Sequence, residues 1–297
     1  MKAHCEEQQT DSPQRDYMGH LPEISTDMPA IIQYSSGTTG VEKGVVLTHR
    51  NIAVNQYQIF QNFRISPKEK IVSWLPLHHD MGLMGCVFQS LYAGATCILL
   101  SPESFSKRPR LWLQVISDFQ ASISGAPDFA YRLCLSLQAA QIEKLDLSSR
   151  RIAFNGAEPV RHDTLTLFSQ YFAPQGFQQT AFAPCYGLAE ATLLVSIDVS
   201  EGGFHTLQVD RAALQQNQVI IRRNENMHGN RGVSPQNIDD NSCSEHYDIG
   251  YDEEIAFNDI VSCGAICEQL DLQIVVPGTL ISCREFEVGE VLIPGIM

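Results

Sequence analysis

The residues best suited to chemistry lie in one short loop, residues 34–44, which holds three glycines, four Ser or Thr hydroxyls and one lysine. Glycine lets a backbone approach a ligand closely, and successive N–H groups in a turn can surround an anion. The hydroxyls add hydrogen-bond donors, and Lys43 adds a positive charge. The loop predicts a site for a chain of phosphates; the alternative is a polar surface loop between two strands.

The spacing differs from that of the NTPase phosphate loop, in which a lysine and then a hydroxyl residue directly follow the second glycine. Here Lys43 stands three residues after Gly40, and Gly44 occupies the place of the hydroxyl residue. The segment therefore predicts a different class of phosphate-binding loop.

A second candidate, residues 73–83, places His78 and His79 beside Asp80 after a strand-like run. Asp80 stands where a side chain accepts the first N–H groups of a helix. Alternatively, His79 lies at the mouth of a pocket and orients a substrate carboxylate. Residue types alone favour the helix cap, and a metal site lacks an adjacent third ligand.

Two later loops have the composition of a nucleotide site. Residues 153–159 carry a glycine directly after a strand-like run, and residues 184–192 contain Tyr186 followed by Gly187. An aromatic ring before a glycine suits stacking on a base, and Glu190 suits a hard cation bound to phosphates. Taken singly, Tyr186 is expected in the core and Glu190 in solvent. The occurrence of all four segments in this order favours the nucleotide site.

The elements that must position these residues alternate between short apolar runs and helix-period segments. Strands are expected at residues 31–34, 45–47, 71–75, 95–100, 121–124 and 151–154, and helices at 108–119, from 127 onward and at 161–172. This alternation predicts an α/β fold with layered, mainly parallel sheets flanked by helices, in which ligands bind at the carboxyl ends of strands. The expected apolar faces of the three helices are Leu111, Val115 and Phe119; Phe129, Leu133 and Leu137; and Leu165, Phe168 and Phe172.

The sequence changes character after residue 197. Residues 198–260 are polar and rich in acids, which predicts an insertion or a connection, and β-like runs follow at 270–276 and 285–293. We expect a disordered tail at residues 1–27, an α/β core at 28–197, a polar insertion at 198–260 and a truncated β-rich subdomain at 261–297.

Composition restricts the classes of partner. The net charge of −14 over 297 residues argues against nucleic acid and anionic membranes as partners. No apolar run approaches the roughly 20 residues of a membrane span, and the N-terminus has no apolar core typical of a secretory signal. Nine cysteines scattered through apolar runs fit a reducing, cytoplasmic location. A metal cluster at Cys263 and Cys267, with Cys243, Cys283 and His246, is a weaker alternative because the spacing lacks a second close pair.

The order of the motifs closely resembles that of the fatty acyl-AMP ligases, a branch of the adenylate-forming enzymes. The phosphate loop is followed by WLPLHHDMGL, SGAPDFAYRLC, LDLSSRRIAFNGAEPV and CYGLAEATLLVS. The similarity covers residues 31–196 and 261–295, and its one departure in the phosphate loop is Glu42, where the typical loop has proline. The resemblance implies that residues 28–197 are an AMP-binding core.

The resemblance implies a nucleotide site with ATP and Mg²⁺. The β- and γ-phosphates would bind Ser35, Ser36, Gly37, Thr38, Thr39, Gly40 and Lys43. The adenine would lie against Asn155, Gly156, Ala157 and Glu158. Tyr186 would stack on the adenine, Gly187 would let the ring approach, Thr192 would lie near the α-phosphate and Glu190 would bind the metal ion.

The resemblance also implies an acyl site and a chemical step. His79 and Asp80 would lie where the carboxylate of a fatty acid meets ATP, and Met81, Gly82, Gly125, Pro127 and Phe129 would line the acyl channel. The groups expected to act in catalysis are Thr39, Lys43, His79 and Glu190. The carboxylate attacks the α-phosphorus, pyrophosphate leaves and an acyl-adenylate forms. Positioning and electrostatic stabilisation are sufficient for this step, so no protein nucleophile is required.

The expected acceptor of the acyl group is an acyl carrier protein or a polyketide or peptide synthase module. The upstream part of the family, its ribose-binding aspartate and its C-terminal lysine-bearing domain fall outside these residues, so we expect weak nucleotide binding and slow or no adenylation by this chain alone. Two alternatives stay open: an acyl-CoA ligase or amino-acid adenylation core, for which Asp128 is the available partner of an amino group, and a non-catalytic remnant.

Overall fold

The computed structural model describes residues 23–35, 43–222 and 257–293. The expected first two strands form an antiparallel hairpin, β1 (Pro29–Ser35) and β2 (Lys43–Thr48), in which Ser35 pairs with Lys43. Directly after β2, helix α1 (His49–Phe63) begins at a capping box, because the Thr48 hydroxyl accepts the Asn51 N–H and the Asn51 side chain accepts the Thr48 N–H.

The centre of the fold is a seven-stranded sheet in the order β11-β8-β7-β6-β5-β3-β4. Its strands are β3 (Lys70–Ser73), β4 (Thr96–Leu99), β5 (Ile123–Ala126), β6 (Ile152–Asn155), β7 (Phe182–Gly187), β8 (Leu194–Ile197) and β11 (Ala265–Ile266). The strands from β4 to β7 are parallel, whereas β8 and β11 are antiparallel. The expected α/β fold with a mainly parallel sheet is therefore confirmed.

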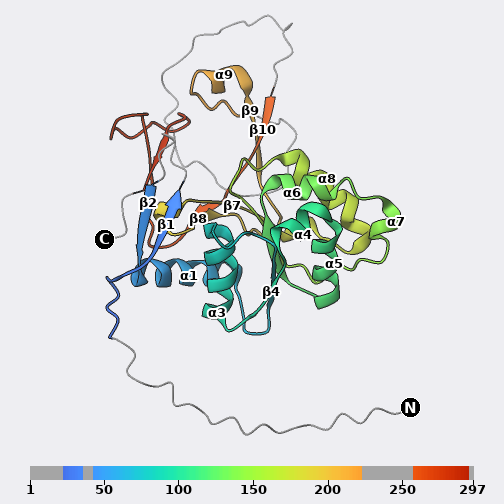
Figure 1. Cartoon of the computed structure of the whole chain (residues 1–297). Helices are drawn as coiled ribbons and strands as arrows, with labels where there is room; N and C mark the ends of the chain where they lie inside the picture. Colours follow the sequence, from blue (N-terminus) through green and yellow to red (C-terminus); the bar gives the residue numbers. More distant parts are fainter. Residues whose placement is uncertain (1–22, 36–42, 223–256, 294–297) are drawn as a thin grey trace, which may run out of the picture.

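Helices flank this sheet, with α1 and α3 on one side and α4 to α8 on the other (Figure 1). The further helices are α2 (Asp80–Gly82), α3 (Gln89–Ala93), α4 (Pro102–Lys107), α5 (Arg110–Phe119), α6 (Asp128–Cys134), α7 (Ala139–Ile142), α8 (His162–Phe172) and α9 (Arg211–Gln215). A π-helical segment, η1 (Leu83–Phe88), continues α2, and three short 3₁₀ turns are η2 (Ala173–Gln175), η3 (Gln179–Ala181) and η4 (Ala189–Ala191).

The core under α5, α6 and α8 is aromatic. Its fully buried members include Trp112, Tyr131, Phe168, Phe172 and Phe182, and most of their ring pairs meet edge to face. The inward face predicted for residues 161–172 is confirmed, since its three apolar residues are fully buried on α8.

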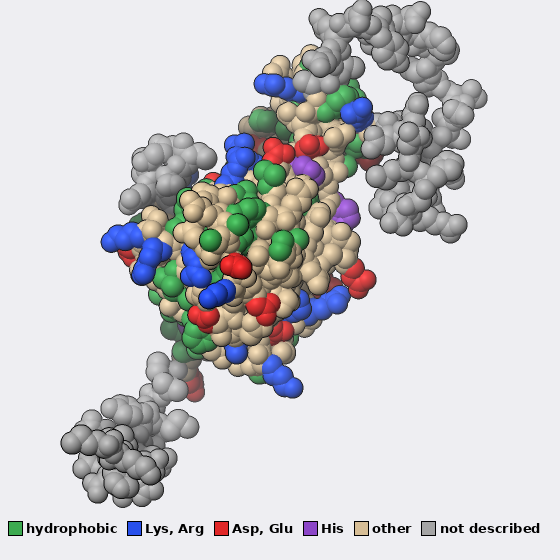
Figure 2. Space-filling view, turned by 90° about the vertical axis from the view of Figure 1, so that its right-hand side faces the viewer, with side chains coloured by type: hydrophobic (Ala, Val, Ile, Leu, Met, Phe, Trp, Pro, Cys, Tyr) green, Lys and Arg blue, Asp and Glu red, His purple; other side chains and the backbone are tan. Residues whose placement is uncertain are grey.

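The inward faces predicted for the other two helices are wrong, except at Leu137, which is buried in the core beyond the end of α6. In α5 the buried residues are Trp112, Leu113, Ile116 and Ser117, and Phe119 is 46% exposed. In α6 the buried residues include Ala130, Tyr131 and Cys134, whereas Phe129 and Leu133 are exposed. Both helices have more apolar residues than one face can hold. In each helix the buried residues include those one position after the predicted ones. Figure 2 shows the outer side of these helices, where hydrophobic areas lie among mixed acidic and basic side chains.

Two further antiparallel strand pairs of the described residues lie outside the central sheet. Strand β9 (Thr206–Asp210) pairs with β10 (Phe257–Val261), and β12 (Gln273–Val275) pairs with β13 (Glu290–Leu292). The second pair agrees with the β-like runs expected near the C-terminal end. The first pair and α9 fall within the predicted polar insertion, where the sequence indicated no regular element. The tail at 1–22 and the middle of the insertion, 223–256, lie outside the described residues.

Candidate active site

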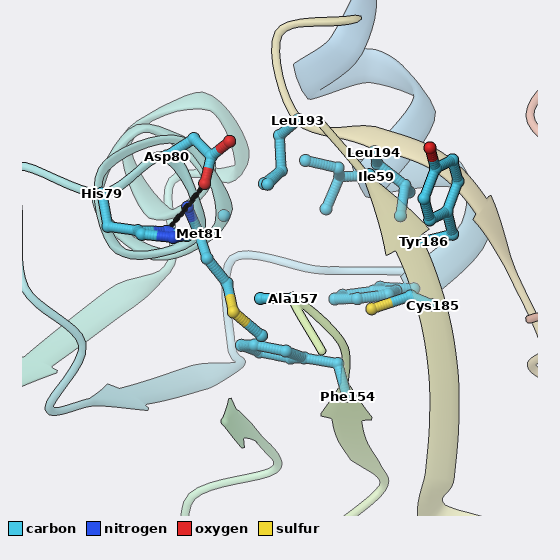
Figure 3. A pocket seen from close by; sticks show the side chains of 13 residues that line it. Ile59, His79, Asp80, Met81, Phe154, Ala157, Cys185, Tyr186, Leu193 and Leu194 are labelled. Atoms are coloured by element: carbon cyan, nitrogen blue, oxygen red, sulfur yellow. Dashed lines mark hydrogen bonds and ion pairs between the residues drawn. The ribbon is translucent and has the colours of Figure 1, made fainter. Parts of the chain in front are cut away.

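Loops that follow β3, β6 and β7 meet at one cavity of about 190 Å³ (Figure 3). The three strands belong to the parallel part of the sheet, so their carboxyl ends lie at the same edge. The cavity is lined by Ile59, Phe63, His79, Asp80, Met81, Gly85, Phe154, Ala157, Cys185, Tyr186, Gly187, Leu193 and Leu194. Six residues predicted to act in substrate or nucleotide binding are thus brought together: His79, Asp80, Met81, Ala157, Tyr186 and Gly187.

His79 and Asp80 form a hydrogen-bonded pair at the wall of the cavity. His79 Nδ1 lies 2.8 Å from Asp80 Oδ1, and the same oxygen accepts the Met81 N–H at 2.7 Å. Met81 N also lies 3.3 Å from His79 Nδ1, but one nitrogen cannot donate to Asp80 and accept from Met81 at once. The shorter contact assigns the proton to Nδ1. Helix α2 begins at Asp80, so His79 occupies the cap position predicted for Asp80, while the Asp80 carboxylate accepts the first N–H group.

The environment of His79 favours its protonated form. The hydrogen bond to Asp80, and secondarily the negative charge of that carboxylate, raise the pKa of His79 above its ordinary value against the opposing effect of burial. The side chain is 51% exposed, and its second ring nitrogen is not needed for the pair. An imidazolium at the cavity wall is suited to attract a carboxylate, so the helix-cap and substrate-binding interpretations are compatible.

The loop after β6 has a strained turn at the cavity. Ala157 adopts a φ of 69°, in the left-handed region that residues with a side chain seldom occupy. Next to it, Glu158 Oε1 accepts the Phe129 N–H at 2.6 Å, which places this carboxylate at the first turn of α6. Gly156 packs against the backbone of Cys185. The loop is therefore held between α6 and β7 with Ala157 facing the cavity.

Asn155 and Asp128 form a buried polar network beneath this loop. Asp128 Oδ1 accepts Asn155 Nδ2 at 3.2 Å and the Arg161 N–H at 3.1 Å, and its Oδ2 accepts the Thr164 hydroxyl at 2.7 Å. Asp128 is 3% exposed and lines neither this cavity nor the larger one that adjoins it. Its oxygens are occupied by the protein, so Asp128 is not placed to hold the amino group of a substrate.

Tyr186 stands at the mouth of the cavity with 39% of its surface exposed. The β7–β8 register shifts between Tyr186 and Gly187, and a β-carbon on Gly187 would lie 2.0 Å from the carbonyl oxygen of Leu193. Only glycine permits this close approach of the two strands. The approach fixes the turn that presents the Tyr186 ring.

A second, more polar cavity of about 870 Å³ adjoins the first. Four residues, Ala157, Cys185, Tyr186 and Gly187, line both cavities. The second cavity extends along residues 158–163 and strand β10 to Cys263. Tyr186 thus lies between a largely apolar compartment and a larger, more polar one, which suits a ligand with a lipid part and a nucleoside part.

Two residues expected beside the phosphates and the metal ion are not part of the lining of either cavity. Glu190 is exposed on the 3₁₀ turn η4, and Thr192 is 1% exposed with a φ of 73°. A β-branched residue in this region is strained. The strained residue forms part of the turn that leads the chain back to Leu193 and Leu194, which line the first cavity. Neither residue is among those that line either cavity.

The structure does not bring four expected acyl-channel residues to the cavity. Gly82 packs against the carbonyl of Pro76 within α2, and Pro127 precedes α6. Phe129 is 49% exposed and packs edge-on against Trp74. Gly125 lies within β5, and a β-carbon there would stand 2.2 Å from the ring of Phe154. Gly125 therefore makes room for a cavity residue without lining the cavity itself.

The phosphate loop is described only at its ends. Ser35 and the exposed Lys43 face each other as the last backbone pair of the β1–β2 hairpin, so the loop connects the tips of two strands. Ser36, Gly37, Thr38, Thr39 and Gly40 lie outside the described residues. Their role in binding phosphates stays a prediction.

The sequence interpretation missed the apolar part of the cavity. Ile59 and Phe63 come from α1, Leu193 and Leu194 from the start of β8, and Phe154 from the end of β6. Ile59 and Phe63 are four positions apart on a helix, a spacing that indicates one buried face, but nothing local shows that this face borders a site. Gly85, in the π-helical segment, and Cys185, on β7, are the other lining residues that the sequence did not indicate.

Thiol and metal chemistry receive no support from the described residues. Burial raises the pKa of the Cys185 thiol to about 12, so it is protonated at neutral pH and is a poor nucleophile. Within residues 23–35, 43–222 and 257–293 there is no group of three or more His, Cys, Asp or Glu side chains suited to hold a metal ion. Cys243 and His246, part of the alternative metal cluster, lie outside these ranges. A metal ion at this site would need phosphate oxygens among its ligands.

Among the described residues, no helix has the length and apolar character needed to cross a membrane.

Two known proteins of similar sequence share one description, that of a fatty acid–[acyl-carrier-protein] ligase. The chain is 42% identical over 207 residues to the medium-chain fatty acid–[acyl-carrier-protein] ligase TtuA of Teredinibacter turnerae, covering 69% of this chain and 32% of that protein. It is 37% identical over 271 residues to the enzyme of the same description, JamA, of Moorena producens, covering 91% of this chain and 41% of the relative. The chain thus spans well under half the length of these relatives.

A solved structure has the same fold. The fatty acyl-adenylate ligase from L. pneumophila, in complex with acyl adenylate and pyrophosphate, superimposes with a TM-score of 0.78 at 36% identity, over 93% of this chain and 44% of that one. The family model described as AMP-binding enzyme matches residues 2–224. With this match over most of its length, and with loops converging at the carboxyl edge of the sheet, the chain belongs to the AMP-binding, adenylate-forming enzymes.

Proposed function

We propose that this chain binds a fatty acid and ATP for the formation of an acyl-adenylate and pyrophosphate, and that the acyl group then passes to a carrier protein. The observation that carries the proposal is the pair of cavities separated by Tyr186. The first is largely apolar with the His79–Asp80 pair in its wall, and the second is larger and has more polar and charged side chains in its lining. The relatives described as acyl-carrier-protein ligases support the carrier protein as acceptor.

In this proposal His79 positions the substrate carboxylate. The imidazolium attracts the carboxylate at the cavity wall, and the apolar side chains behind it exclude water from the acyl chain. Tyr186 stacks on the adenine, and the loop of Ala157 and Glu158 borders it. Ser35, Lys43 and the loop between them would bind the phosphates, Thr192 would act near the α-phosphate, and Glu190 would contribute to the metal site. Mg²⁺, when bound on the phosphates, neutralises charge that develops on them.

Amino-acid activation is less well supported, because the oxygens of Asp128 are occupied by Asn155, Arg161 and Thr164. Formation of a thioester when coenzyme A is added to an extended form of this chain would favour the acyl-CoA ligase alternative over the acyl-AMP ligase.

Calorimetry with a fatty acyl sulfamoyl-adenosine, a hydrolysis-resistant analogue of the acyl-adenylate, tests the proposal without requiring turnover. We expect binding by the chain and a loss of about tenfold or more in the Tyr186→Ala variant, since stacking on a base contributes about 1–3 kcal/mol. Tyr57→Ala is the matched control, because Tyr57 is 40% exposed, compared with 39% for Tyr186, and lines neither cavity.

Absence of any heat with the analogue, or equal losses in the two tyrosine variants, would contradict the proposed site. Fatty-acid-dependent release of pyrophosphate should be slow or undetectable with this chain alone. A rapid release would show that the described core is sufficient for the reaction, contrary to our expectation.

A further inference from the structure

Helix α1 carries a buried amide in line with its two cavity residues. Asn55, Ile59 and Phe63 follow one another at intervals of four positions, so their side chains lie on one face of the helix. Asn55 is fully buried. A buried amide is costly unless it is hydrogen-bonded, and leucine would suit the helix and its apolar neighbours better. We therefore looked for the polar groups that Asn55 contacts.

The main partner of Asn55 is the backbone of Leu194, the first residue of β8. Asn55 Nδ2 donates to the Leu194 carbonyl at 2.9 Å, and Asn55 Oδ1 accepts the Leu194 N–H at 3.1 Å. Strand β11 pairs with β8 at Ser196 and Ile197, so Leu194 lies beyond that pairing. The amide thus gives Leu194 the donor and the acceptor that a neighbouring strand would supply.

A second buried amide fixes the orientation of the first. Asn55 Nδ2 also donates to Gln58 Oε1 at 3.1 Å, and Gln58 Nε2 donates to the Glu268 carbonyl at 2.6 Å. If the oxygen and nitrogen of Asn55 were exchanged, donor would face donor and acceptor would face acceptor at Leu194. A buried network in which the members satisfy one another holds them in one arrangement.

The residue held by Asn55 ends the turn that links β7 to β8. Residues 188–193 form this turn, which carries Glu190 and Thr192, and the φ of Thr192 is 73°. Strained backbone persists only where its surroundings leave no alternative. The turn begins at Gly187, where β7 and β8 approach closely, and it ends at the backbone groups that Asn55 pairs. Both ends of the strained turn are therefore fixed.

We propose that Asn55 is a positioning residue of this site, which fixes the turn 188–193 through the backbone of Leu194. The inference rests on the proposed function, which assigns Glu190 to the metal ion and Thr192 to the α-phosphate. It adds a residue that lines neither cavity. Without the amide, the N–H and carbonyl groups of Leu194 would need water as a partner, and the end of the turn would open more often.

Hydrogen exchange, measured on the full chain by mass spectrometry, tests the hold on the turn without any ligand. Asn55→Leu removes both bonds to Leu194 and keeps a side chain of similar size. We expect the amides of residues 188–194 to exchange about tenfold faster, because two hydrogen bonds that oppose opening are lost.

Gln56→Leu is the matched control for exchange. Gln56 is the next residue of α1, it is 2% exposed, and its Nε2 donates to the Met84 carbonyl at 3.1 Å. The control therefore also removes a buried amide and its bond to a distant backbone group. It should leave the exchange of residues 188–194 unchanged.

Ligand affinity separates a positioning role from a contribution to stability alone. The fatty acyl sulfamoyl-adenosine has a group in place of the α-phosphate, whereas adenosine has none. In folded Asn55→Leu, calorimetry should show the analogue binding about fivefold more weakly, while NMR titration shows unchanged binding of adenosine, which requires only Tyr186 and the adenine loop. A residue that merely stabilises the fold would change neither affinity.

If Asn55→Leu does not fold, Gln58→Met takes its place. This variant leaves both bonds to Leu194 but frees the Asn55 amide to rotate, so exchange in residues 188–194 should rise by a smaller factor, about threefold. Unchanged exchange in Gln58→Met would refute the role of the amide network.

The outcomes keep the two proposals apart. If the unmodified chain does not bind the analogue, the proposed function fails and the positioning role fails with it. If it binds, but Asn55→Leu binds equally well or exchanges at the same rate in residues 188–194, the proposed function stands and the role of Asn55 is refuted. Equal losses for the analogue and for adenosine would also refute it, because the effect would then not be specific to the turn.

Discussion

The Nδ1 proton of His79 is shared with a carboxylate that also accepts the first N–H group of α2. This arrangement couples the charge of a site residue to the start of a helix. A histidine with a folded-state pKa above its unfolded value stabilises the fold below that unfolded value, and the stabilisation is lost as pH rises through the folded pKa. The raised pKa of His79 therefore has consequences for both binding and stability.

We predict that NMR titration of His79 gives a pKa above the ordinary 6.5, and that Asp80→Asn lowers it. Asparagine retains an oxygen for the Met81 N–H, so the helix start survives while the charge is lost. Asp80→Asn should lower the free energy of unfolding more at about pH 6 than at about pH 9. Asp163→Asn, at an exposed acid in the first turn of α8, should leave His79 unaffected. A His79 pKa at or below 6.5 in the unmodified chain would contradict this assignment.

Arg150 is a buried cation, and no carboxylate among the residues that the structure describes pairs with it. It is 4% exposed, its guanidinium lies 5.0 Å from the centre of the Trp112 ring, and its Nη2 donates to the carbonyl of Ser124 and to the Tyr131 hydroxyl. Its Nε and Nη1 are buried, and no hydrogen-bond partner for them lies in the described part of the chain. Burial lowers the pKa of Arg150, which indicates that its charge is costly to the fold.

We predict that Arg150→Met raises the free energy of unfolding by about 1–3 kcal/mol, because an unpaired buried charge is replaced by an apolar chain of similar length. Arginine stays protonated throughout the ordinary pH range, so the gain should not vary between about pH 6 and pH 9. Urea unfolding measures it, with Arg132→Met on the exposed side of α6 as the control. Destabilisation by Arg150→Met would show that the aromatic rings and the two hydrogen bonds outweigh the cost of burial.

At the scale of elements, the strand ends and α1 supply different parts of the site. The strands β3, β6 and β7 deliver the polar loops to one edge, whereas α1 and the start of β8 supply the apolar side chains. Strand β5 has an indirect role, since its Gly125 admits the ring of Phe154 from the neighbouring strand. The site therefore depends on close packing between β5 and β6.

We predict that Gly125→Ala lowers the free energy of unfolding by about 1–3 kcal/mol and weakens binding of an eight-carbon acyl sulfamoyl-adenosine, because the added methyl group displaces Phe154. Gly202→Ala is the matched control, since a β-carbon at Gly202 would meet nothing within 4 Å. Unfolding by urea and calorimetry report the two effects. An unchanged affinity in folded Gly125→Ala would show that Phe154 does not shape the compartment.

The sequence predicts helix positions better than helix orientations. Helices α5, α6 and α8 occur where periodicity indicated them, yet only α8 buries the predicted face. In α8, Leu165 stands between two threonines, so the predicted face is well marked even though the exposed Leu167 precedes Phe168. In α5, Trp112 and Leu113 lie next to Leu111, and the choice of face depends on the sheet against which the helix packs. Local sequence does not contain that information.

At the scale of the whole molecule, the parallel sheet follows from alternating strands and helices, and its carboxyl edge predicts where the loops meet. The motifs found in the sequence supply the polar residues of the site, including His79, Asp80 and Tyr186. The apolar residues were not predictable, because Phe63 and Leu193 become neighbours of the motifs only through tertiary packing. The pairing of β11 with β8 likewise depends on a contact between distant segments.

The central claim is that one ligand occupies both compartments, with its acyl chain against Phe63 and Phe154 and its adenine on Tyr186. A crystal structure of this chain with the eight-carbon acyl sulfamoyl-adenosine tests it most directly. The account predicts density for the chain between His79 and the two phenylalanines and for the adenine beside Tyr186. A ligand bound elsewhere, or turned so that its adenine fills the apolar compartment, would contradict it.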